Sequence, residues 1–360
     1  MTDLFTPIKV GNYELPNRIF MAPLSRSRAS AGGIPNALMA EYYAQRASAG
    51  LIIAEAAAVS PLGMGWRNAP GCFSDAQQKG WALVTDRVHA KDGRIFLQLW
   101  HMGNLVHPDF IQGQQPVSSF PATAPGQIIT PSGVEKAFVL PRALSKAEIG
   151  ETRQAFVAAA KRAIAAGFDG IEIHAANGFL IDQFTRDSIN QRADEYGGSV
   201  DNRLRFMLEI VADLCNAIGS AKVGIRISPT NKVWGIRDTH PEITFGRAAE
   251  KLNDFDLAYL HVLEPKPETR HFMATVGHIM PLLRQCYNGV LIANCGYTQQ
   301  TGNAAIENRE ADAIAYGSWF ISNPDLVARF VHNAPLTEPD RGTYYSDGAR
   351  GYTDYPLMQY

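Results

Sequence analysis

The sequence lacks several features that mark whole classes of protein. Its 33 lysines and arginines nearly balance its 35 aspartates and glutamates, for a formal net charge of -2, so it has no basic excess of the kind that general nucleic-acid binders show. It contains no uncharged apolar run of about 18 residues that would cross a membrane as a helix. Its first residues, MTDLFTPIKVG, do not resemble a secretory signal peptide. We therefore expect a cytoplasmic protein that binds neither nucleic acid nor membrane.

Cysteine is scarce, and its spacing excludes two kinds of site. The cysteines are Cys72, Cys215, Cys286 and Cys295, and no two of them form a CxxC pair. This argues against a zinc ribbon and against a dithiol redox pair, and no other cluster predicts a metal ion. With 360 residues, of which 46% are hydrophobic, the chain can bury a large core without disulfides, and it is not intrinsically disordered.

Short apolar runs alternate with amphipathic stretches along the chain. The runs are rich in Ile, Leu and Val without strict polar alternation, which is typical of parallel strands buried on both faces. They cover residues 18–24, 50–56, 94–100, 170–176, 222–228, 257–264, 289–295 and 311–317. Helix-like segments lie at 36–48, 76–91, 146–166, 201–218, 242–254, 276–286, 298–308 and 324–333.

Local signals support several of these helix ends. Ser74 with Gln77 and Ser145 with Glu148 have the spacing of capping boxes. Asn323 before Pro324 predicts an N-cap followed by a first-turn proline. Gly219 predicts a C-terminal stop for the 201–218 segment.

A strand followed by a helix, repeated eight times, predicts a (β/α)8 TIM barrel that forms one domain over residues 1–360. The rival is a doubly wound open sheet, which usually has a glycine-rich turn after its first strand, whereas APLSRSR follows the first strand here. The start, FTPIKVGNYELPN, predicts a short hairpin that turns at Gly11-Asn12 and closes the barrel floor. The long irregular stretch 101–144, after the third strand, is expected to cap the active-site face.

In such a barrel the C-terminal ends of the strands carry the functional site. The residues there are mostly neutral donors and acceptors, with one fixed cation and glycines after the last two strands: Ser25, Gln98, His174, Asn177, Arg226, Gly296 and Gly317. There is neither a carboxylate pair placed for glycoside cleavage nor a GxSxG elbow. The two glycines, backed by a helix that starts near Asn323, favour a phosphate site. The pattern thus indicates a phosphorylated cofactor that performs the chemistry.

Structural alternatives exist for single residues in this set. A strand-end histidine such as His174 is often structural, although Asn177 in the same turn can donate a hydrogen bond to the same oxygen atom. A buried cation needs a partner. An ion pair of Arg226 with Glu172 or Glu55 is therefore the alternative to a cofactor-binding role.

These residues lie in segments that resemble the Old Yellow Enzyme family of FMN-dependent ene-reductases. The resemblance runs from about Leu4 to Pro356, and its most specific part is IHAANG followed by DEYGGS and NR. It also includes NRIFMAPLSRSRA, EYYAQRASAGLIIAEA, QLWHMG, ISNPDL and GYTDYP. It implies a single TIM barrel with non-covalent FMN, NADPH or NADH as reductant, and small electron-poor alkenes (enones, maleimides, nitroalkenes) as substrates. We expect a monomer or a homodimer.

The resemblance also implies residue roles. The flavin ring is expected to contact Pro23, Leu24, Ser25, Ala56, Gln98 and His174, with Arg226 near N1 and the C2 carbonyl, where it stabilises the anionic reduced flavin. The phosphate is expected at Cys295, Gly296, Gly317 and Ser318. His174 and Asn177 hold the substrate's carbonyl or nitro oxygen while hydride passes from flavin N5 to the β-carbon. Trp66, Trp100 and Tyr345 are expected to line the pocket.

Three positions depart from the family pattern. Phe179 stands where the family usually has the tyrosine that donates a proton to the α-carbon, Ser318 stands where an arginine usually binds the phosphate, and Ser25 replaces a common threonine. The main reading is an NADPH dehydrogenase or ene-reductase. The alternatives are a flavin-dependent reductase of quinones or nitro compounds, whose substrates do not need that proton, and a flavin-binding protein with impaired proton delivery.

Overall fold

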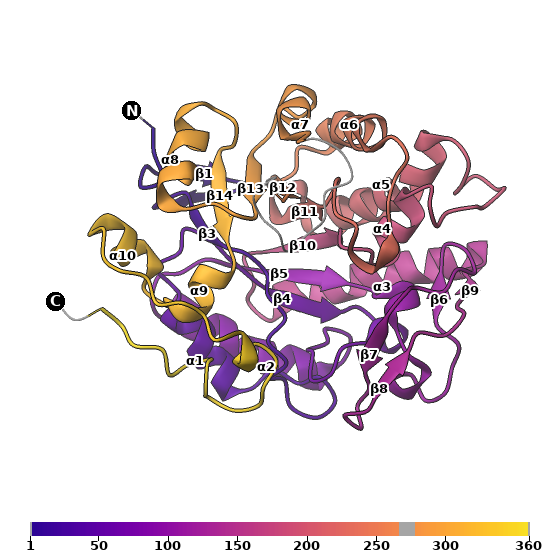
Figure 1. Ribbon diagram of the computed structural model, residues 1–360, viewed down its shortest axis with the longest axis horizontal. Coiled ribbons are helices and arrows are strands. Elements are labelled where there is room, and N and C mark those ends of the chain that lie inside the picture. The colour runs from indigo at the N-terminus through magenta and orange to yellow at the C-terminus, as the bar shows by residue number, and fades with distance from the viewer. Residues whose placement is uncertain (1, 266–277, 359–360) are drawn as a thin grey trace.

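A closed barrel of eight parallel strands forms the centre of the protein (Figure 1). The computed structural model describes residues 2–265 and 278–358. The barrel strands, in order around the barrel, are β3 (Ile19–Met21), β4 (Ile52–Ala58), β5 (Ile95–Trp100), β10 (Gly170–Ala175), β11 (Val223–Ile227), β12 (Tyr259–Leu263), β13 (Leu291–Asn294) and β14 (Ala313–Tyr316), and β14 pairs with β3 to close it. Each of the eight apolar runs overlaps one strand, so the predicted (β/α)8 barrel is confirmed.

Helices surround the barrel on its outside (Figure 1). They are α1 (Ala37–Gln45), α2 (Asp75–His89), α3 (Lys146–Ala165), α4 (Leu180–Thr185), α5 (Val200–Ile218), α6 (Pro241–Leu252), α7 (Met280–Cys286), α8 (Gln299–Glu307), α9 (Ser318–Ser322) and α10 (Leu326–Val331). Every predicted helix overlaps one of them, although the first two residues of the 276–286 segment lie outside the described residues. The short helices α4 and α9 were not predicted. Helix α4 has only six residues, which is too short for a helical period to stand out in the sequence.

The predicted helix ends are confirmed except for one. Both capping boxes form, and Gly219 ends α5 with a φ of 87°. The N-cap predicted at Asn323 is wrong, because this residue follows α9 and its amide oxygen and nitrogen bond to the backbone N–H and C=O of Thr337. Helix α10 begins at Leu326, with Asp325 as its N-cap residue.

The N-terminal hairpin closes one end of the barrel, as predicted. Its strands β1 (Ile8–Val10) and β2 (Tyr13–Leu15) pair antiparallel around Gly11. The buried side chains of Ile8, Val10 and Leu15 pack with barrel-interior residues such as Phe96. Gly11 has a φ of +54°, and a Cβ there would lie 1.9 Å from the carbonyl oxygen of Ala221, just before β11. The hairpin therefore sits against the N-terminal ends of the strands.

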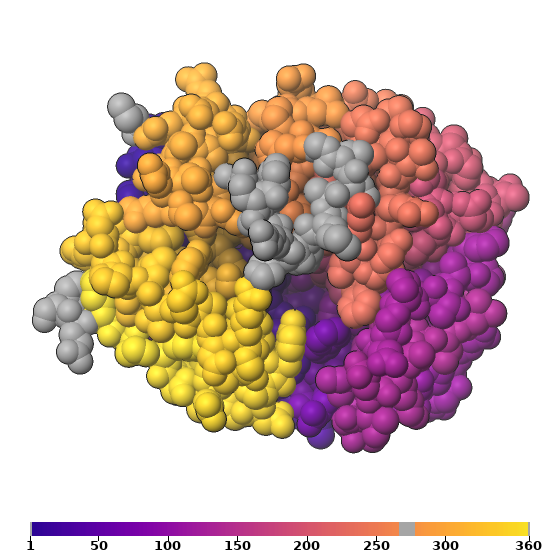
Figure 2. All heavy atoms as spheres, in the orientation of Figure 1, coloured from indigo at the N-terminus to yellow at the C-terminus, as the bar shows by residue number. Residues whose placement is uncertain are grey.

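The excursion 101–144 after β5 is more regular than its composition suggests. It contains a parallel pair, β6 (Val117–Ser118) with β9 (Arg142–Ala143), and an antiparallel hairpin, β7 (Gln127–Ile129) with β8 (Glu135–Ala137). Its buried residues Ile128 and Phe138 cluster with Trp100 and Phe179 at the C-terminal end of the barrel. Figure 2 shows a hollow between the magenta excursion and the yellow C-terminal segment, which is where the candidate site lies.

Candidate functional site

Two adjoining cavities lie at the C-terminal ends of the barrel strands. The first has a volume of about 300 Å³, and its lining includes Pro23, Leu24, Ser25, Ala56, Trp66, Gln98, Trp100, His174, Asn177, Phe179, Arg226, Ser318 and Tyr345. The second has a volume of about 450 Å³ and is lined by Cys295, Gly296 and Gly317 together with Pro23, Leu24, Arg226 and Ser318 of the first. The structure thus brings every site residue named from the sequence into the lining of these two adjoining cavities, together called the joined cavity here.

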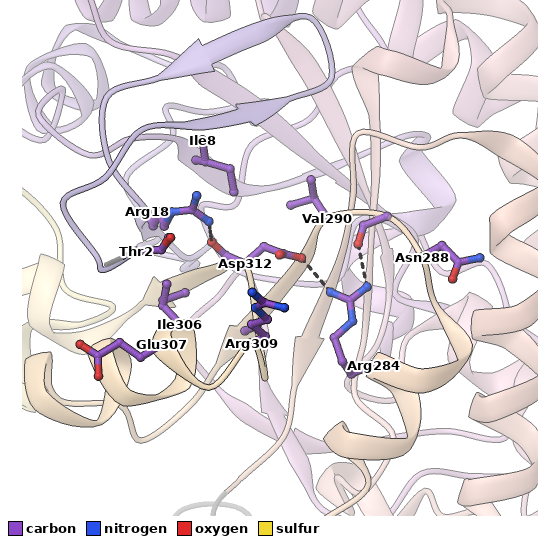
Figure 3. A pocket seen from close by; sticks show the side chains of 12 residues that line it. Thr2, Ile8, Arg18, Arg284, Asn288, Val290, Ile306, Glu307, Arg309 and Asp312 are labelled. Atoms are coloured by element: carbon purple, nitrogen blue, oxygen red, sulfur yellow. Dashed lines mark hydrogen bonds and ion pairs between the residues drawn. The ribbon is translucent and has the colours of Figure 1, made fainter.

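A larger cavity, about 1030 Å³, lies at the opposite end of the barrel (Figure 3). Its lining includes Arg18, Val290 and Asp312, which precede β3, β13 and β14. Arg18 donates to the backbone carbonyl of Asp312, and Arg284 forms an ion pair with the Asp312 carboxylate at 2.8 Å. The charged residues of this cavity bond to one another and hold the strand ends together. Cavity volume alone therefore does not identify the functional end of the barrel.

Arg226 has one side-chain partner in the described part of the chain. Its guanidinium is buried, and Nη2 donates to Oδ1 of Asn294 at 2.6 Å, while Nε has no hydrogen-bond partner among the described residues. Burial lowers the pKa of this guanidinium, and the charge of Glu172 raises it. The predicted ion pair of Arg226 with Glu172 or Glu55 does not form, because neither carboxylate lies within 4 Å of the guanidinium. Glu55 instead accepts from the backbone N–H of Arg26 and the hydroxyl of Tyr43.

His174 and Asn177 lie together where β10 ends. Asn177 adopts a left-handed φ of 58°, a conformation that asparagine tolerates better than most residues. Its Oδ1 accepts from Nδ2 of Asn231 at 2.8 Å, which leaves its own Nδ2 as a donor for a bound group. Burial and the charge of Arg226 hold the pKa of His174 well below its usual value. The imidazole is therefore neutral, and its Nδ1 has no hydrogen-bond partner among the described residues.

Aromatic rings form the walls of the cavity above this pair. The ring of Phe179 stands edge-on to Trp100 and to His174, with centroids 4.7 Å away in both cases. Two further aromatic wall residues were missed from the sequence, Trp234 and Tyr344. Trp234 has a φ of 60° and packs against Phe138 of the excursion. Neither residue is at a strand end, so no sequence signal placed them.

Two buried arginines after β3 hold the C-terminal segment that carries Tyr344 and Tyr345. Arg26 donates to the carbonyl oxygens of Tyr344 and Gly351, and Arg28 donates to those of Thr343 and Tyr344. The indole of Trp66 meets the ring of Tyr345 edge-on at 5.3 Å. The pocket wall is thereby built from segments at both ends of the chain.

The end of the joined cavity that Cys295, Gly296 and Gly317 line has few charged residues. Gly296 and Cys295 have positive φ values of 76° and 96°, and Ser318 begins α9. The helix beside Gly317 is therefore α9, and the predicted backing by a helix that starts near Asn323 is wrong. Apart from Arg226, no arginine or lysine lines this end within the described ranges.

Comparisons with known proteins cover nearly the whole chain. The sequence profile of the NADH:flavin oxidoreductase / NADH oxidase family matches residues 3–337. The chain is 40% identical over 363 residues to 12-oxophytodienoate reductase 2 of Arabidopsis thaliana, covering 99% of this chain and 96% of the relative. It is 43% identical over 374 residues to 12-oxophytodienoate reductase 7 of Oryza sativa subsp. japonica, covering 99% and 94%.

Solved structures show the same likeness. The Old Yellow Enzyme homologue from Zymomonas mobilis superposes with a TM-score of 0.97 at 44% identity, over 99% of this chain and all of the other (100%). Morphinone reductase in complex with tetrahydroNAD superposes with a TM-score of 0.94 at 42% identity, over 100% and 98%. Among the described residues, no helix combines the length and hydropathy needed to span a bilayer. The chain belongs to the Old Yellow Enzyme family of FMN-dependent oxidoreductases.

Proposed function

We propose that the protein binds FMN without a covalent link and uses NADPH or NADH to reduce the C=C bond of electron-poor alkenes such as enones, maleimides and nitroalkenes. The observation that carries this proposal is the donor pair at the end of β10. Neutral His174 and Asn177, whose Nδ2 donates to no residue in the described ranges, both line the cavity that the barrel leaves open. Two such donors can hold one carbonyl or nitro oxygen and withdraw electrons from the adjacent alkene.

The residues of the joined cavity fit FMN. Pro23, Leu24 and Arg226 line both of its parts, and two adjoining spaces suit a flat ring system with a tail. The buried Nε of Arg226 has no hydrogen-bond partner among the described residues and can donate to the ring's carbonyl edge. Bound there, FMN supplies the hydride that it has received from the nicotinamide. A solved relative, morphinone reductase, binds tetrahydroNAD, which supports a nicotinamide reductant.

This chain's residues would bind, orient and protect the reactants. Arg226 places a fixed positive charge beside the cofactor's carbonyl edge. Ser25 would offer its hydroxyl to the flavin ring. The backbone at Gly296 and Gly317 would offer N–H groups to the phosphate, with the Ser318 hydroxyl in place of a charged side chain. Phe179 lines the cavity but has no hydroxyl group that could donate a proton. Since His174 is neutral and desolvated, the proton for the α-carbon would come from water.

The visible spectrum of the purified protein tests this proposal. We expect a yellow protein that releases FMN, identified by mass, on heating or acid treatment. Anaerobic NADPH or NADH should bleach the flavin band, and cyclohexenone should then restore it with one saturated ketone formed per flavin. Release of FAD, or a colourless protein that takes up no added FMN, would reject the proposal. A flavin that is reduced but not reoxidised by any acceptor would indicate a flavin-binding protein without reductase activity.

A second activity, reduction of quinones or nitro compounds, is favoured by Phe179 itself. These acceptors take hydride and then receive protons from solvent, so they do not need a hydroxyl at position 179. Product analysis separates the two activities, because an ene-reductase gives a product with a saturated C–C bond whereas a quinone or nitro reductase gives a hydroquinone or a hydroxylamine.

A further inference from the structure

Two buried residues, Glu172 and His261, lie next to the joined cavity without being part of its lining. Glu172 of β10 is fully buried, and its Oε1 accepts from Nε2 of Gln98 at 2.7 Å. Its Oε2 lies 2.8 Å from Nδ1 of His261. The strand register explains the first contact, because Glu172 pairs directly with Gln98 across β10 and β5. The same register places His174 and His261 on either side of Arg226.

The contact with Glu172 decides which way the Gln98 amide points. Oε1 of Glu172 accepts from Nε2 of Gln98, so the NH2 group of Gln98 faces the carboxylate. The amide oxygen is then left for the cavity that Gln98 lines. That end can accept a hydrogen bond from a cyclic imide N–H, which the oxidised flavin ring presents.

Glu172 also has an electrostatic role that its contacts define. No lysine or arginine in the described parts of the chain lies within 4 Å of its carboxylate. Its charge does act on Arg226, whose pKa it raises. A negative charge in this position offsets part of the positive charge that Arg226 offers to a bound anion.

We propose that Glu172 is a positioning residue for the cofactor: it orients the Gln98 amide toward the flavin and, as a buried counter-charge to Arg226, lowers the flavin's reduction potential. The proposal rests on the proposed function, because it requires FMN in the joined cavity. The Glu172 carboxylate has two effects, a hydrogen bond to Gln98 and a negative charge, and different substitutions remove them.

Glu172→Gln removes the charge but keeps an oxygen that can accept from Gln98. The ratio of the affinities for reduced and oxidised FMN should rise about tenfold, the factor expected for unit charges roughly 10 Å apart at an effective dielectric constant of about 20. For a two-electron couple this equals a potential about 30 mV higher. The affinity for oxidised FMN should change little.

Glu172→Met removes both effects. It should raise the potential similarly and weaken oxidised FMN binding roughly tenfold, as loss of one oriented hydrogen bond does. In a Gln98→Leu background, Glu172→Met should no longer weaken oxidised FMN binding but should still raise the potential. Asp169→Asn is the matched control. Asp169 is also a buried residue with a carboxylate and directly precedes the same strand, β10, but its carboxylate accepts from Arg94 and from the backbone N–H of Ile95. This variant should lower thermal stability without shifting the potential.

Potentials are measured by equilibration with a reference dye, affinities by fluorescence titration of the apoprotein with FMN, and folding by thermal unfolding. If the unchanged protein binds FMN but Glu172→Gln keeps its potential, Glu172 is only structural and this inference is overturned while the proposed function stands. Additive losses of FMN affinity in Gln98→Leu with Glu172→Met would overturn the orienting role. If the unchanged protein takes up no FMN, the proposed function and this inference both fall.

Discussion

At the scale of single residues, the site depends on side chains whose donors are directed by neighbours. Asn177 is the clearest case, because Asn231 holds its amide oxygen and thereby turns its NH2 group toward the cavity. Asn231 in turn accepts from the backbone N–H of Val233 through its own Oδ1. This chain of contacts determines the hydrogen-bonding character of a residue that lines the joined cavity.

Asn231→Asp should therefore disable Asn177 without touching it. The aspartate keeps the acceptor for Val233 but places an oxygen against Oδ1 of Asn177, so the Asn177 amide must flip and present its oxygen to the cavity. We expect binding of para-substituted phenols and enone reduction to weaken about 10- to 100-fold, the range for hydrogen bonds to charged groups. Absorbance titration of the phenol charge-transfer band measures this. In an Asn177→Ala background the same substitution should have little further effect; full additivity would show that Asn231 acts elsewhere.

Phe179 provides a second residue-scale prediction. Its ring lines the cavity and stands edge-on to His174, and tyrosine adds a single oxygen at the ring edge. Phe179→Tyr should supply the missing acid, so that nitroalkene reduction releases less free nitronate and protonates it roughly 100-fold faster. Stopped-flow absorbance of the nitronate measures the partitioning. If nitronate release, enone rate and α-carbon stereochemistry all stay the same, position 179 is only a pocket wall.

At the scale of elements, the hairpin β1–β2 shows how one glycine docks a whole segment. A Cβ at Gly11 would lie 1.9 Å from the Ala221 carbonyl oxygen, in a backbone conformation with positive φ. Gly11→Ala should thus displace the hairpin and cost about 2 kcal/mol or more of the free energy of unfolding.

Gly133→Ala is the matched control for Gly11→Ala. Gly133 also has a positive φ, 81°, but a Cβ there would meet no atom within 4 Å, so this variant carries only the conformational cost. Urea unfolding of both variants separates the two contributions. Equal losses would show that the close approach to Ala221 relaxes without cost.

At the scale of the whole molecule, buried neutral histidines link stability to pH. Burial lowers the pKa of His101 to about 3, whereas an unfolded chain binds this proton below about pH 6.5. Because the unfolded state binds more protons in this window, the stabilisation is complete above about pH 6.5 and is lost as the pH falls toward 3.

His101→Gln should remove part of this dependence. Below about pH 6 the wild-type free energy of unfolding should fall by up to about 1.4 kcal/mol per pH unit more steeply than that of the variant. Urea unfolding at pH 7.5, 6.0 and 5.0 gives both slopes. Parallel slopes would mean that His101 is protonated in the folded protein as readily as in the unfolded chain.

The sequence by itself determined the barrel and the inventory of its site. Eight apolar runs of strand length can bury both faces only in a sheet covered by helices, and the residues at their ends then meet at one rim, so Gln98, His174 and Arg226 could be named in advance. The family motifs added the expected cofactor and the departure at Phe179.

Only the tertiary structure decided which side chains contact one another. Whether Arg226 met Glu172 or Asn294 depended on the order and stagger of strands around the closed barrel, which residue patterns do not encode. Trp234 and Tyr344 reach the cavity from loops whose paths are set by contacts with distant segments. Asn323 matched an N-cap locally, but Thr337, fourteen residues away, satisfied its side chain instead. Hydrogen-bond partners far apart in the chain are chosen by three-dimensional proximity, and local sequence signals cannot anticipate that choice.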